Sequence, residues 1–113
     1  MEECKEFKRI ETKDIRDKKN EEKIEYNGDL FDGDLNSKNK LFQASQIFKG
    51  TETGIDWITA NNKIAKLKGK DLENIVSLLS TREQELFTRF ADRLTDIESC
   101  KDVENIKKIK WEA

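Results

Sequence analysis

The sequence contains no histidine among its 113 residues. Histidine is the commonest general base, the commonest metal ligand and the central member of most hydrolytic triads. Enzymes without histidine use paired carboxylates or lysine, but these need a folded cleft, and the chain has little material from which to build one. We therefore expect a protein that is not an enzyme, with no catalytic residues, no metal and no cofactor.

Cysteine is scarce as well, and Cys4 and Cys100 lie almost the whole chain apart. A disulfide framework or a metal site would show closer, repeated spacings. We expect two unpaired, reduced thiols, as is usual in a reducing compartment. Cys100 falls at the rim of an apolar stripe, where a thiol serves as a small hydrophobe.

Neither sign of charge dominates, because 24 acidic residues nearly cancel 22 basic ones. The basic footprint of a nucleic-acid binder is missing, so we expect no nucleic-acid partner. No apolar run approaches the roughly 18 residues of a membrane span, and residues 1–14 lack the apolar core of a secretory signal. We therefore expect no membrane partner and a chain that folds in the cytoplasm.

Apolar residues are few, at 35% against 41% charged. Such a chain folds around a narrow apolar stripe or leaves a segment unfolded, and we expect both. Residues 1–22 hold 15 charged side chains. Phe7 and Ile10 would suit a short helix, but the spacing to Ile15 breaks the pattern. We expect a flexible charged arm over 1–22, either an attachment segment or a solubilising tail, followed by a single α+β domain over 23–113.

Two β-hairpins are predicted in the first half of that domain. Asn27-Gly28 between short alternating arms is a strong hairpin signal and predicts a hairpin over 23–31, with Tyr26 opposite Asp29. Asn61-Asn62 predicts a two-residue turn in a second hairpin over 55–67. Trp57 could be a platform for a base or a sugar, but a lone strand tryptophan more often anchors a small core. Tyr26 and Trp57 are thus expected structural anchors.

A helix over 37–48 is predicted between the hairpins. Ser37 is its expected N-cap. Its expected buried face consists of Leu41, Ala44, Ile47 and Phe48. The acids of Asp32 and Asp34 before it invite comparison with a calcium loop, but the EF-hand pattern fails because Gln43 stands at the twelfth position. Turn chemistry explains these residues better.

A long amphipathic helix over 71–99 is the most informative prediction. Its apolar sector comprises Leu72, Ile75, Val76, Leu79, Leu86, Phe87, Phe90, Leu94 and Ile97. Glu83 falls within this sector. Either Ser80 and Glu83 form a capping box that starts a new helix, or the helix is unbroken and Glu83 faces a partner chain or an arginine such as Arg82 or Arg89. We favour one helix.

A short helix over 102–109 is predicted near the C-terminus. Asp102 caps it, and Val103 and Ile106 fold it back on the long helix. Trp111 is the expected lid on that pair and the third structural anchor.

The order of motifs along the chain is recognisable. A Tyr-x-Gly hairpin, an Asp-x-x-Ser helix start and a Trp-x-x-Ala-Asn-Asn turn precede a leucine-rich helix with an internal Arg-Glu pair, an Ala-x-x-Leu-x-x-Ile segment and a closing Ile-x-Trp. The residues are Tyr26, Gly28, Asp34, Ser37, Trp57, Ala60, Asn61, Asn62, Leu72, Arg82, Glu83, Ala91, Leu94, Ile97, Ile109 and Trp111. Over about residues 23–111 this resembles the family numbered 4376 among domains of unknown function, found in phage and prophage tail-fibre regions.

The resemblance implies a tail or tail-fibre accessory protein. We expect it in the host cytoplasm during assembly, whether or not it then remains in the virion tail. It provides no catalytic residues. The leading hypothesis is therefore a structural or assembly protein that binds a protein partner or itself. The predicted contact residues are Leu79, Leu86, Phe90 and Leu94. These residues could equally pack under the two hairpins as core.

Two other functions are less well supported. A small regulatory protein, such as an acidic inhibitor of a host nuclease, would need its acids clustered on one face, whereas Lys and Glu alternate evenly here. An enzyme using Asp32 and Asp34 would lack histidine, a Gly-rich phosphate loop and metal-ligand spacing.

Overall fold

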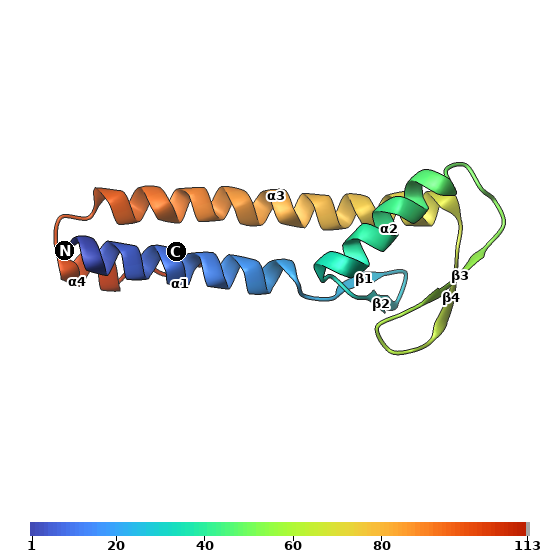
Figure 1. The fold of residues 1–113 in the computed structure, drawn as a ribbon, viewed down its shortest axis with the longest axis horizontal. Coiled ribbons are helices and arrows are strands. Elements are labelled where there is room, and N and C mark those ends of the chain that lie inside the picture. The colour runs from blue at the N-terminus through green and yellow to red at the C-terminus, as the bar shows by residue number, and fades with distance from the viewer. Residues whose placement is uncertain (113) are drawn as a thin grey trace. The chain divides into compact units, whose positions relative to one another are not determined.

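The computed structural model describes residues 1–112, and its mixed α+β fold is the one predicted (Figure 1). It contains two antiparallel strand pairs, a long helix and a short C-terminal helix. The elements are α1 (Glu2–Asn20), β1 (Ile24–Tyr26), β2 (Asp29–Phe31), α2 (Leu35–Ile47), β3 (Ile55–Ile58), β4 (Ile64–Leu67), α3 (Gly69–Ser99) and α4 (Val103–Lys107).

The chain divides into two compact units, unlike the predicted arm and single domain over 23–113. Unit 1 consists of residues 1–19 and 83–112, and unit 2 is Asn20–Arg82. Helix α3 contributes its first part to unit 2 and the rest to unit 1.

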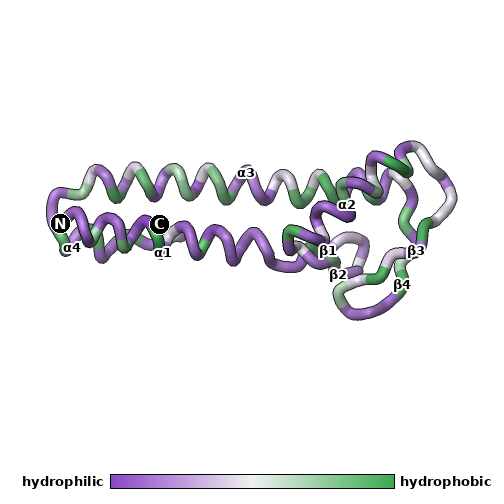
Figure 2. The backbone as a smooth tube through the Cα atoms, in the orientation of Figure 1, coloured by the Kyte–Doolittle hydropathy of each residue, from purple (hydrophilic) through white to green (hydrophobic). Residues whose placement is uncertain are grey.

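The N-terminal segment is a 19-residue helix, α1, where a flexible arm was predicted. Exposed ion pairs one turn apart support it, including Arg9–Glu6 at 2.9 Å and Asp14–Lys18 at 3.0 Å. Figure 2 shows α1 as mostly hydrophilic. Its buried residues are Lys5 and Thr12, so its packed face is polar. The prediction failed because it required an apolar face for a durable helix.

The first hairpin has the predicted register, with Tyr26 opposite Asp29 and Ile24 opposite Phe31. Asn27 and Gly28 adopt positive φ angles of 50° and 82°, as a two-residue turn requires. Phe31 of this hairpin lies in the core of unit 2, and its side chain is fully buried.

The second hairpin also forms, but its turn is longer than predicted. Ile58 pairs with Ile64, and the Thr59 amide donates to the Lys63 carbonyl at 2.8 Å. The Asn62 amide donates to the Thr59 carbonyl at 3.0 Å, and only Asn62 of the two asparagines has a positive φ, of 60°. This is a type I turn followed by a left-handed residue, which needs three loop residues.

The core of unit 2 lies between the hairpins, α2 and the start of α3. It comprises Phe31, Leu41, Ala44, Ala65, Leu67, Leu72, Ile75 and Leu79. Helix α2 begins at Leu35 with Asp34 at the N-cap, where Ser37 was predicted. Leu41 and Ala44 face inward as predicted, but Ile47 is 73% exposed, so that part of the prediction was wrong.

Helix α3 begins beside the first hairpin and runs without a break through Ser80. The Lys68 amide donates to the Asp71 carboxylate at 2.8 Å, which satisfies one of the free amides at the helix start. The Asp71 carboxylate also accepts from the Tyr26 hydroxyl at 2.8 Å. The hypothesis of one helix is confirmed, and Glu83 lies exposed on its surface.

In unit 1, α1 runs antiparallel to the C-terminal part of α3 (Figure 1). The Lys5 ammonium donates to the Glu98 carbonyl at 3.1 Å. Helix α4 starts at the predicted cap, where the Asp102 carboxylate accepts from the Asn105 amide at 2.8 Å. Arg93 then donates to the Lys110 carbonyl at 3.2 Å, so the chain folds back on α3 as predicted.

Candidate protein-interaction surfaces

The predicted contact residues do not form one open surface. Leu79 is only 5% exposed and belongs to the core of unit 2, beside Leu72 and Ile75. The alternative interpretation, that the stripe is packing under the hairpins, therefore holds for Leu79.

Leu86, Phe90 and Leu94 lie in unit 1, where each is partly buried. The Arg16 guanidinium of α1 lies over the Phe90 ring, 4.5 Å from its centroid. Such a contact combines cation–π attraction with cover for the ring face. The stripe of α3 is thus covered in part by the polar side of α1. Phe87, which was predicted to share this sector, is 58% exposed.

An ion pair joins α1 to the C-terminal part of α3. Arg9 of α1 pairs with Glu98 of α3 at 2.9 Å and, within α1, with Glu2 at 3.2 Å. The hydrogen bonds that Arg9 donates to Glu98 and Glu2 raise the pKa of Arg9. In turn, the bond from Arg9, with the nearby charge of Lys5, lowers the pKa of Glu98 below its ordinary value.

We expect Glu98→Gln to weaken unit 1 slightly at pH 7 and to have no effect in strong acid. Because the folded-state pKa of Glu98 is lowered, its stabilising contribution is present above the ordinary glutamate pKa, about 4.5, and is lost as the pH falls through the lowered value. The pair is exposed, so the effect is small and is screened by salt. Urea unfolding of both proteins across this pH range measures it, and Glu3→Gln, at an exposed site on α1, is the control.

The three predicted structural anchors are all at least partly buried. Tyr26 donates to Asp71 and accepts from the Asn74 amide at 3.1 Å, which fixes the first hairpin to α3. Trp57 packs against the core of unit 2 and also lines a pocket of about 320 Å³ with Asp32 and Lys40. Trp111 is buried in unit 1.

The largest difference from the predicted surface is on α2, which carries exposed apolar side chains. Leu35, Phe42 and Ile47 are 69%, 55% and 73% exposed. Residues 35–51 contain no acid, in a chain where 41% of residues are charged. Sequence reasoning missed this surface because it assigned α2 a single buried face. The acid-free segment was the signal that could have revealed it.

Two smaller apolar surfaces are also exposed. Phe7 and Ile10 lie on the side of α1 away from the buried Lys5 and Thr12. Ile58 and Ile64 form an exposed cross-strand pair at the end of the second hairpin.

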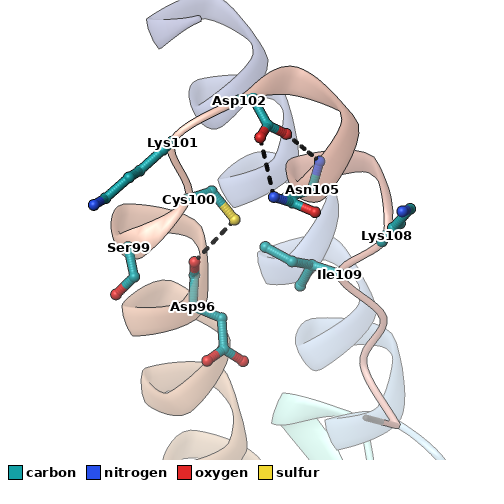
Figure 3. Close-up of a pocket in the computed structure, with 8 residues that line it drawn as sticks. All are labelled: Asp96, Ser99, Cys100, Lys101, Asp102, Asn105, Lys108 and Ile109. Carbon is teal, nitrogen blue, oxygen red and sulfur yellow. Dashed lines mark hydrogen bonds between the residues drawn. The ribbon is translucent and has the colours of Figure 1, made fainter.

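A pocket in unit 1 lies at the turn from α3 to α4 (Figure 3) and measures about 590 Å³. The Cys100 thiol donates to the Asp96 carbonyl at 3.2 Å, and Asp102 accepts from the amide and side chain of Asn105. These bonds close the end of one helix and the start of the next, so the polar groups serve the turn. Within residues 1–112, no group of three or more His, Cys, Asp or Glu residues could hold a metal ion.

The family model of a domain of unknown function, DUF4376, matches residues 3–110. The chain belongs to the DUF4376 family. The match confirms the family named from the motif order, but it corrects the predicted extent of about 23–111, because it includes nearly all of α1. For this DUF4376 member, no curated protein and no solved structure gives a match. None of its helices within residues 1–112 is long and apolar enough to cross a membrane.

Proposed function

We propose that this protein is a non-enzymatic accessory component of a phage or prophage tail or tail fibre, acting through protein–protein contacts made by the outer face of α2. The observation that carries the binding role is that α2 has apolar residues on both faces and covers only one. Leu41 and Ala44 are buried in unit 2, whereas Leu35, Phe42 and Ile47 are exposed. Apolar side chains left exposed on a helix that already buries its other face are typical of a contact surface.

The composition of this face supports contact with protein. The exposed residues around Phe42 are uncharged amides, among them Asn39, Gln43 and Gln46. Interface centres are depleted of charged residues and enriched in aromatic ones, as this face is compared with the rest of the chain. The same face does not support the acidic inhibitor, because it lacks acids. The tail location rests on the resemblance of the motif order to a family found in tail-fibre regions.

Particle composition tests this proposal. Cells producing phage with wild-type protein, Phe42→Glu or Ser80→Glu are lysed, and the purified particles are quantified by mass spectrometry. We expect wild type and Ser80→Glu in the particles and Phe42→Glu reduced by about 30-fold, the effect of losing an interface hot spot. Ser80 is an exposed residue of α3 in unit 2, so it controls for the added charge. Particles without the wild-type protein would contradict the tail role.

A further inference from the structure

A pocket of about 320 Å³ in unit 2 lies between β3 and α2. Its lining comes from the residue after β2, from α2 and from β3, and consists of Asp32, Ser37, Lys40, Leu41, Asp56, Trp57 and Ile58. Pockets for small molecules begin at about 300 Å³, so this one has room for a single small ligand. Leu35, Phe42 and Ile47 are not among the lining residues, so the pocket is separate from the outer face of α2.

Trp57 gives the pocket an aromatic wall that the fold holds in place. The side chains of a strand alternate between its two faces, and in β3 Ile55 and Trp57 are half-buried, whereas Asp56 and Ile58 are exposed. Trp57 packs against the core of unit 2, which includes the fully buried Leu41, and it also lines the pocket. The core contact restricts the indole. The electron-rich face of such a ring attracts polarised C–H groups, such as those on the face of a sugar.

The outer edge of β3 supplies backbone groups to the same pocket. The Thr59 amide donates to the Lys63 carbonyl at 2.8 Å, and in an antiparallel pair only alternate residues bond across the hairpin. The backbone of Trp57 therefore pairs with β4, whereas the amides and carbonyls of Asp56 and Ile58 point away from β4. Both of these residues line the pocket, so its edge offers backbone donors and acceptors.

Two exposed side chains of opposite charge complete the lining. Asp32 follows β2, and Lys40 lies on α2. An ionised carboxylate only accepts hydrogen bonds, whereas an ammonium group only donates them. An anionic ligand is repelled by Asp32 and a cationic ligand by Lys40. A neutral ligand whose groups both donate and accept hydrogen bonds satisfies both side chains and the backbone edge of β3.

We propose that this pocket binds a neutral pyranose sugar, with a C–H face of the ring on Trp57 and its hydroxyl groups bonded to Asp32, Lys40 and the outer edge of β3. Each sugar hydroxyl both donates and accepts, so neighbouring hydroxyls engage a carboxylate and an ammonium group together. A nucleobase also stacks on tryptophan, but the phosphate of a nucleotide would meet the Asp32 carboxylate. The site does not use the outer face of α2, so this inference goes beyond the proposed function and does not depend on it.

The two tryptophans of the chain make the test specific. Trp57 lines the pocket, whereas Trp111 is buried in unit 1 and serves as an internal reference. The indole N–H signals of the isotope-labelled full-length protein are followed by NMR during addition of the methyl glycosides of glucose, galactose and mannose. Choline chloride and sodium phosphate are the cationic and anionic comparison probes.

We expect the Trp57 signal to move saturably with at least one glycoside, in the millimolar range typical of so small a ligand, while the Trp111 signal stays in place. Asp32→Ala should weaken this binding about tenfold, the effect of losing a hydrogen bond to a charged group. Glu25→Ala removes an exposed acid of β1 outside the pocket and should leave the binding unchanged. Lys40→Ala, also at an exposed position, replaces Asp32→Ala if the spectrum of that variant is not native-like.

A Trp57 signal that does not move with any glycoside overturns the proposal, and so does tighter binding of choline or phosphate than of every glycoside. The corresponding reducing sugars separate two sources of the ligand. Tighter binding of the methyl glycosides supports a sugar unit within a polysaccharide, and tighter binding of the reducing sugars supports a free sugar.

Discussion

Leu79→Glu is expected to unfold unit 2. Leu79 is 5% exposed and packs in the same core as Leu72 and Ile75. Removing a buried leucine costs about 2–5 kcal/mol, and burying a carboxyl group without a partner costs several more. The sum is comparable with the whole stability of a typical domain, about 5–15 kcal/mol. Circular dichroism during urea unfolding should therefore show the loss of a cooperative transition.

Ser80→Glu is the matched control for this experiment. It adds the same charge one residue further along α3, at an exposed position, and should unfold like the wild type. A Leu79→Glu variant that stays folded would contradict this expectation. If only its mass in solution changed, Leu79 would lie on a binding surface, which the sequence alone also allows.

Gly69→Ala is expected to destabilise unit 2 by about 1–3 kcal/mol, the usual effect of forcing extra volume into a packed site. A methyl group at Gly69 would lie 2.2 Å from the Phe48 carbonyl oxygen and 3.0 Å from the amide nitrogens of Gly50 and Thr51. These are backbone atoms, so they cannot move aside as a flexible side chain would. The Gly69 amide also donates to the Thr51 carbonyl at 2.9 Å, which fixes the close approach.

The loss of stability expected for Gly69→Ala is opposite in sign to the usual effect of this substitution in a helix. Glycine to alanine in a helix normally stabilises a protein by about 1 kcal/mol. Ser77→Ala, at an exposed position of the same helix, should show a small gain of this kind. Urea unfolding of both variants compares the two effects. A gain in stability for Gly69→Ala would contradict the close contact between the start of α3 and the segment after α2.

The hairpins and the long helix were predictable because local chemistry determines them. Asn27-Gly28 accepts the positive φ angles of its turn whatever surrounds it. The apolar residues from Leu72 to Ile97 recur with the helical period, so α3 could be located to within two residues. The second turn was harder, because Asn61-Asn62 suits a two-residue turn as well as the observed three-residue loop with a left-handed Asn62, and the two differ in loop length and register.

Helix α1 was missed because its stability comes from contacts that sequence periodicity does not report. Its packed side carries Lys5, Thr12 and Arg16. The long side chains of Lys5 and Arg16 cover other surface while their charged ends find partners, and the Thr12 hydroxyl donates to the Lys8 carbonyl at 2.6 Å. Hydropathy along the chain marks these as solvent-facing residues. The apolar Phe7 and Ile10 that suggested a packed face are exposed.

The exposed face of α2 was missed for a related reason. An apolar stripe on a helix predicts that the stripe is covered, but it does not say by what. For α3 the cover is the rest of the same chain, as Leu79 shows. For α2 the sequence suggested one buried face, and the exposure of Phe42 and Ile47 became visible only once the position of the core was known.

The apolar stripe of α3, apart from the exposed Phe87, is internal packing, whereas the outer face of α2 is open. Hydroxyl-radical footprinting of the dilute protein tests it most directly, because the chain has six phenylalanines with equal intrinsic reactivity. We predict rapid oxidation of Phe7, Phe42 and Phe87, slower oxidation of Phe48 and Phe90, and almost none of Phe31. Oxidation of Phe90 as fast as that of Phe87, together with a protected Phe42, would contradict the claim.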